Sequence, residues 1–127
     1  MQFAIYYSMT RITSYKDLQV WQLSMDLVDV CFDIIDVLPP RYAFTFCNQL
    51  LRSSISIPSN TAEGSRRPRR AYLNYLSIAL GSQAEVETLL EVIKRRRLAP
   101  PLLLSKASLL TESIGRMLHG LVRSLEQ

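Results

Sequence analysis

The sequence predicts an all-α protein, an antiparallel up-down-up-down four-helix bundle that assembles into an oligomer. Three observations lead to this prediction. Apolar residues recur at the three-and-four spacing of amphipathic helices, rather than alternating as in strands, over four long segments. The connections between these segments contain proline or glycine and are a few residues long, which favours sequential antiparallel helices. A chain of 127 residues, 48% hydrophobic, can bury one core without disulfides or metal.

The first part of the chain divides into an arm and a helix. Residues 1–13 show no regular period and are expected to form an irregular arm, followed by one bundle domain over residues 14–127. The first predicted helix covers residues 17–38 and ends before Pro39 and Pro40, which cannot continue it. Its acidic residues form one narrow stripe: Asp26, Asp29, Asp33 and Asp36. The remaining circumference is apolar, which predicts several neighbours, within the bundle or across a subunit boundary.

The second predicted helix, residues 43–63, organises the bundle and contains Pro58 in its interior. An interior proline removes a backbone donor and costs about 3 kcal/mol, so neighbouring helices must stabilise this turn. Gly64 follows as a left-handed C-terminal residue, and Ser65 is a possible cap for the next helix.

The third predicted helix covers residues 68–97, and its core pattern includes two polar residues, Gln83 and Glu87. A lone buried carboxylate is expensive to desolvate, so we expect Glu87 to pair with Arg52 of the second helix. The predicted structural polar network comprises Gln49, Arg52, Asn60, Glu63, Gln83, Glu85 and Glu87. Gly81 and Ser82 are small enough to let another helix approach closely. After Pro100 and Pro101, residues 102–125 form a regular fourth amphipathic helix.

Three separated motifs carry a family resemblance: YKDLQVW at residues 15–21, RSSISIPSNTAEG at residues 52–64, and ALGSQAEVE at residues 79–87. In order and spacing they resemble the S23, or 23S rRNA intervening-sequence, family of four-helix bundle proteins. The chain is also similar to the accessory proteins of diversity-generating retroelements, basic pentameric bundles that bind nucleic acid and a reverse transcriptase. The resemblance implies a homopentameric ring without known catalytic activity. The motif positions that it carries over are Arg52, Ser59, Asn60, Glu63, Gly64, Gly81, Ser82, Glu85 and Glu87.

Two basic clusters lie at the ends of the third predicted helix. They comprise Arg66, Arg67, Arg69 and Arg70 before it, and Lys94, Arg95, Arg96 and Arg97 at its end. Cations at a helix C-terminus offset the helix dipole, but cations at an N-terminus are mildly unfavourable and need another reason. Because arginine suits bidentate phosphate contacts, we predict nucleic-acid binding, RNA or DNA, through these clusters. Alternatives are a solvated face, or ion pairs with the aspartate stripe of a neighbouring subunit. Tyr72 and Tyr75 follow the first cluster and could stack on bases or belong to the core or an interface.

The sequence lacks the residues that several functional classes require. His119 is the only histidine and lies on a polar face, so histidine-based metal sites and catalytic triads are not expected. Ser59 has no activating neighbour, and the glycines form no phosphate loop. The sequence therefore predicts no enzyme, no metal site and no cofactor.

The remaining features concern location and partners. Cys31 and Cys47 suggest buried thiols rather than a disulfide scaffold, and no apolar run predicts a membrane span, so we expect a cytoplasmic protein. The net charge of +4 permits attraction to phosphate polymers. We expect a non-catalytic oligomer, with a pentamer implied by the resemblance, that binds nucleic acid. The alternative is a purely structural or protein-interaction oligomer, for example an accessory subunit of a reverse transcriptase.

Overall fold

The computed structural model describes residues 14–127, and this part of the chain consists of four long helices and three short helical turns, without a strand. The four helices are α2 (Gln19–Val37), α3 (Asn48–Ser65), α4 (Arg69–Arg95) and α5 (Pro101–Glu126). The turns are two 3-10 turns, η1 (Tyr15–Asp17) and η2 (Pro40–Tyr42), and one π-helical turn, η3 (Ala43–Cys47). The predicted all-α class with four helices is confirmed. The predicted arm over residues 1–13 lies outside the described residues.

Helix α2 begins two residues later than predicted because a capped turn, η1, precedes it. Ser14 Oγ accepts a hydrogen bond from the Lys16 backbone N–H (3.2 Å), and the Ser14 N–H donates to Asp17 Oδ2 (3.1 Å). This reciprocal arrangement is a capping box, and it leaves Leu18 extended before the helix starts. The other end of α2 lies at Val37, just before the two prolines, as the sequence predicts.

The segment predicted as the second helix contains two kinds of helix. Its first residues form the π-helical turn η3, and α3 begins only at Asn48. Pro58 lies buried inside α3, where it cannot donate to the carbonyl of Ser54. Small hydroxyl side chains line the same buried side and donate to carbonyls of the preceding turn: Ser53 to Gln49 (2.7 Å), Ser54 to Leu51 (3.1 Å) and Thr61 to Ile57 (2.8 Å). The polar side chains of α3 can therefore face its neighbours without unsatisfied buried donors.

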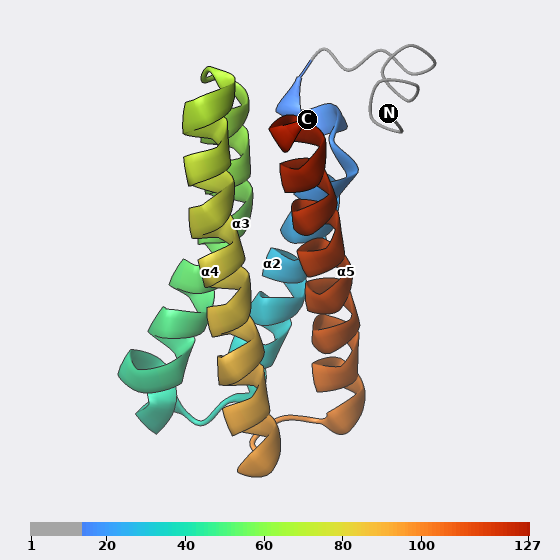
Figure 1. Ribbon diagram of the computed structural model, residues 1–127. Helices are drawn as coiled ribbons and strands as arrows, with labels where there is room; N and C mark the ends of the chain where they lie inside the picture. The colour runs from blue at the N-terminus through green and yellow to red at the C-terminus, as the bar shows by residue number, and fades with distance from the viewer. Residues whose placement is uncertain (1–13) are drawn as a thin grey trace.

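Each helix packs against two neighbours, in the ring order α2, α3, α4, α5. The α3–α4 connection lies at one end of the helices, as does the C-terminus, and the α2–α3 and α4–α5 connections lie at the other end (Figure 1). Fully buried side chains from all four helices form the core, among them Leu27, Ile34, Leu50, Ile57, Leu76, Val86, Ile93, Ile114 and Leu118. The 27 residues of α4 give it a length of about 40 Å. Its two ends, with their basic clusters, are therefore far apart.

Large apolar side chains also remain on the outer faces of the helices. Leu109 of α5 is 64% exposed and Ile78 of α4 is 53% exposed. On α2 and α3 the corresponding residues are Met25, Phe32, Val37 and Ile55. No helix within residues 14–127 is sufficiently long and apolar to cross a bilayer.

Candidate nucleic-acid interface

The α3–α4 connection presents the first basic cluster, the N-terminal arginine cluster of α4, to solvent. All four of its side chains are exposed: Arg66, Arg67, Arg69 and Arg70. The connection is tight because the Arg67 N–H donates to the carbonyl of Gly64 (2.9 Å) and Pro68, in extended conformation, starts α4. Arg69 and Arg70 then occupy the first turn of α4, where the positive end of the helix dipole disfavours cations. The fold thus holds cations where helix stability alone would not place them.

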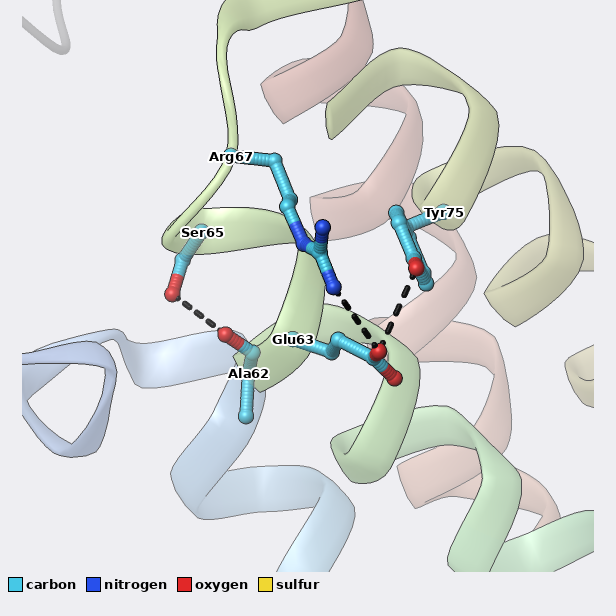
Figure 2. A network of polar contacts seen from close by, with 5 residues as sticks. All are labelled: Ala62, Glu63, Ser65, Arg67 and Tyr75. Carbon is cyan, nitrogen blue, oxygen red and sulfur yellow. Dashed lines mark hydrogen bonds and ion pairs between the residues drawn. The ribbon is translucent and has the colours of Figure 1, made fainter. Parts of the chain in front are cut away.

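Two of these arginines lie against tyrosine rings. The Arg67 guanidinium lies 5.7 Å from the centre of the Tyr75 ring and pairs with Glu63 Oε1 at 3.4 Å. The Tyr75 hydroxyl donates to the same Glu63 oxygen at 3.2 Å, so one carboxylate joins α3 to α4 (Figure 2). Arg66 lies 5.6 Å from the centre of the Tyr15 ring. These contacts restrict Arg66 and Arg67, whereas the side chains of Arg69 and Arg70 make no hydrogen bond or ion pair within residues 14–127.

Gly64 has a different role from the one predicted, because it allows α3 and α4 to approach each other at this end. It lies inside α3 with an ordinary helical backbone, since glycines with positive φ are absent from the described residues. A Cβ atom at Gly64 would lie 2.7 Å from the Tyr75 Cβ and 2.9 Å from the Tyr72 Cδ1. The prediction of a left-handed C-terminal residue is therefore wrong, because Gly64 is required for close helix packing. Ser65 is likewise no cap for α4: its hydroxyl donates to the carbonyl of Ala62 at 2.6 Å (Figure 2).

Tyr72 and Tyr75 pack beside Gly64 and are half-buried. Burial raises the pKa of the Tyr72 hydroxyl to about 12. Of the two roles considered for these tyrosines, packing between α3 and α4 is the one that their positions show.

The second basic cluster, the C-terminal cluster of α4, is also exposed: Lys94, Arg95, Arg96 and Arg97. Arg95 Nε donates to Glu91 Oε2 at 2.9 Å, and this hydrogen bond lowers the pKa of the Glu91 carboxyl. Arg97 has a left-handed backbone (φ 55°), which is unfavourable for a residue with a Cβ. The Leu98 N–H then donates to the carbonyl of Ile93 (3.1 Å), which completes a Schellman ending of α4.

The C-terminal cluster borders a cleft of about 860 Å³ between α4 and α5. Its lining mixes carboxylates and cations: Glu87, Glu91 and Glu112 with Lys94 and Arg97. The two ends of α4 therefore differ electrostatically, because the C-terminal cluster has more carboxylates nearby than the N-terminal cluster.

The predicted ion pair between Arg52 and Glu87 is wrong. Both side chains are exposed, and the ion pairs within residues 14–127 are Glu63 with Arg67 and Glu91 with Arg95. The buried arc of α4 runs from Gln83 through Val86 to Leu89, and this arc leaves Glu87 at its edge. Glu87 borders the α4–α5 cleft, so its carboxylate remains hydrated and needs no buried partner. Gln49 and Glu85, also predicted in this network, are exposed as well.

The polar contacts that do join the helices involve smaller groups. The Ser82 hydroxyl of α4 donates to Ser56 Oγ of α3 at 2.8 Å, and Asn60 Nδ2 donates to the same oxygen at 2.9 Å. Gln83 is buried as predicted, but its Nε2 donates to the carbonyl of Thr111 of α5 at 3.1 Å. Ser82 thus allows close approach of α3, as expected. Gly81 does not, because a Cβ there would meet no atom within 4 Å.

The remaining candidate residues do not converge on a catalytic centre. His119 and Ser59 are exposed. Within residues 14–127 no group of three or more histidine, cysteine or carboxylate side chains is placed to hold a metal ion. The aspartate stripe of α2 is exposed, and Asp26, Asp29 and Asp33 border a groove of about 560 Å³ between α2 and α5.

One surface feature was missed by sequence reasoning. In the α2–α3 connection, the Arg41 guanidinium lies 4.8 Å from the centre of the Tyr42 ring, which packs against Phe46 at 5.3 Å. Phe44, between these rings in sequence, is 89% exposed. The dense run of aromatic residues beside an arginine was the available signal.

The motifs and the helices that they occupy can be compared with known families. The family model described as 23S rRNA-intervening sequence protein matches residues 16–120. The chain belongs to this family. The match begins in η1 and extends through most of α5, so the 23S rRNA-intervening sequence family accounts for nearly all of the described chain, including the α4–α5 connection. Comparison with curated proteins finds no match.

Proposed function

We propose that this member of the 23S rRNA-intervening sequence family is a non-catalytic, antiparallel bundle that binds nucleic acid in the cytoplasm as a homo-oligomer. The observation that carries the proposal is the exposure of all eight cations at the two ends of α4. Of these, Arg67 and Arg95 pair with carboxylates in the described chain, and both pairs are solvent-exposed and therefore weak. The guanidinium groups thus remain available for phosphate.

Assembly of several copies would strengthen phosphate binding. Exposed apolar residues such as Leu109 and Ile78 supply surface for contacts between copies, and the family resemblance implies a pentamer. In a closed ring each copy would contribute the same two clusters, so several weak phosphate contacts would act together. Because the family description refers to 23S rRNA, RNA is the first nucleic acid to test.

The test is a salt titration of RNA and DNA binding. Replacing Arg66, Arg67, Arg69 and Arg70 by alanine should weaken binding at low salt and reduce the slope of log affinity against log salt by about one per lost phosphate contact. The control variant replaces four exposed cations outside the clusters, Arg52, Lys106, Arg116 and Arg123, and so removes the same charge. Equal losses in both variants, or no binding by the native protein at low salt, would reject the proposal.

A second candidate function is a purely structural or protein-interaction oligomer, such as an accessory subunit of a reverse transcriptase. The aspartate-bordered groove between α2 and α5 favours it, because arginines of a neighbouring copy could pair with that acidic border. In this case the arginine-to-alanine variant would lose assembly, seen as a lower mass in light scattering, while the native protein would show no salt-dependent nucleic-acid binding.

A further inference from the structure

The α2–α3 connection exposes an aromatic ring that the fold does not use. Phe44 is 89% exposed, more than any other large apolar residue of the described chain. It lies in the π-helical turn η3, an element that is rare in proteins and frequent at functional sites. A ring exposed to this extent contributes little to core packing and is accessible to a ligand.

The geometry of the turn places this ring away from its aromatic neighbours. Tyr42 and Phe46, four residues apart, pack on each other with ring centres 5.3 Å apart, and Arg41 lies over the Tyr42 ring at 4.8 Å. Phe44, two residues from each, falls on the opposite side of a helical turn. Phe46 thus packs against Tyr42 on one side of this turn, and the ring of Phe44 is exposed to solvent on the other side.

The charge around this turn is positive. The α2–α3 connection lies at the same end of the bundle as the C-terminus of α4 (Figure 1). This end carries five exposed cations: Arg41, Lys94, Arg95, Arg96 and Arg97. The carboxylates near this end number four, one fewer than the cations: Asp36 of α2, Glu87 and Glu91 of α4, and Glu112 of α5, which lines the α4–α5 cleft with Lys94 and Arg97. The excess of cations favours a polyanion as the occupant over a basic protein or a second copy of this positively charged end.

From these observations we propose that the end of the bundle formed by η3 and the C-terminal cluster of α4 binds single-stranded nucleic acid. Phe44 would stack on an unpaired base, and the cations of this end would contact the neighbouring phosphates. This combination of aromatic ring and basic surface is the general basis of single-strand binding, since every base has a face on which a ring can stack. The inference rests on the proposed nucleic-acid binding and specifies the strand state that it selects.

The test compares a labelled single-stranded oligothymidylate with a duplex of the same length, using the full chain. Phe44→Ala should weaken single-strand binding roughly five- to hundred-fold, the range expected for loss of one stacked base, and leave duplex binding unchanged. Phe44→Leu should behave like Phe44→Ala, because leucine is apolar but cannot stack, and Phe44→Trp should retain binding. The salt slope should be the same in all three variants, since none removes a phosphate contact.

Leu102 provides a matched control. It is 86% exposed at the start of α5, at the same end of the molecule, and Leu102→Ala should leave binding to both probes unchanged. Unchanged single-strand affinity in Phe44→Ala, or full affinity in Phe44→Leu, would overturn the inference. So would a lower mass of Phe44→Ala in light scattering, which would identify the ring as a contact between copies.

Failure of this inference can be distinguished from failure of the proposed function. If the native protein binds the duplex with a steep salt dependence and Phe44→Ala binds each probe as tightly as the native protein does, only the stacking inference fails. If the native protein binds neither probe at low salt, both proposals fail.

Discussion

Gly64, in the last turn of α3, and Gly81, in the middle of α4, are both helical glycines, yet their surroundings predict opposite effects of the same substitution. A methyl group at Gly64 would collide with the Tyr75 Cβ, which belongs to the body of α4 and cannot move alone. Gly64→Ala should therefore lower the free energy of unfolding by about 1–3 kcal/mol, as overpacking does. Gly81→Ala meets open space and should raise it by about 0.5–1 kcal/mol, since alanine favours the helix.

Urea denaturation of both variants, followed by circular dichroism, measures this difference. An increase in stability for Gly64→Ala would mean that α3 and α4 are not in close contact at this end. A loss of stability for Gly81→Ala would indicate that another chain packs against α4 there.

At the scale of single residues, part of the candidate site could be predicted. The eight basic residues are exposed as expected because charged side chains rarely remain buried, and helical spacing correctly placed Gln83 inside. Glu87 was misplaced because a helical wheel gives angles but not the direction of the core, which in α4 is shifted towards Leu89. The partner of Gln83, a backbone carbonyl of α5, had no sequence signal at all.

The way α4 ends gives a prediction at the scale of the element. Arg97 has a left-handed backbone, a conformation that glycine adopts without the penalty of a Cβ, whereas Arg96 has a right-handed one. Arg97→Gly should raise the free energy of unfolding by about 0.5–1 kcal/mol, and Arg96→Gly should lower it by a similar amount. Because both changes remove one positive charge, the difference between their urea midpoints measures the effect of backbone conformation alone. Equal midpoints would contradict this account of the helix end.

The extents of the helices were predicted well where proline marks a boundary and less well elsewhere. Prolines adjoin the end of α2 and the start of α5, and those boundaries agree within about one residue. The start of α2 depends on the capping box at Ser14, and η3 on backbone hydrogen bonding that spacing alone does not reveal. The second predicted helix therefore contains two segments with different roles. Helix α3 contributes buried residues to the core, and η3 carries the exposed ring of Phe44.

At the scale of the molecule, burial makes stability sensitive to alkaline pH. Burial raises the pKa of the Cys31 thiol from 9.0 to about 12, so the unfolded chain loses this proton first as the pH rises. The stability that Cys31 contributes is complete below pH 9 and is lost as the pH rises from about 9 to about 12. Between pH 8 and pH 10 the free energy of unfolding should fall by about 1.4 kcal/mol from this group.

Urea denaturation at the two pH values tests this, with Cys31→Ser as the control that cannot titrate. Cys31→Ser should be less sensitive to pH, retaining the smaller losses expected from Tyr72 and from Cys47, whose pKa values are also raised by burial. An identical pH dependence of the two proteins would show that Cys31 is hydrated in the folded state.

Sequence reasoning placed both basic clusters on one helix, and the length of that helix determines what a ligand can reach. Along double-stranded DNA, 3.4 Å per base pair, the roughly 40 Å of α4 corresponds to about 12 base pairs, or slightly more than one turn of the double helix. A shorter duplex can touch only one end of a given subunit, whereas a longer one lying along α4 can engage both. Affinity measured against duplex length should therefore rise in two stages, and the position of the step reports the spacing of the two clusters.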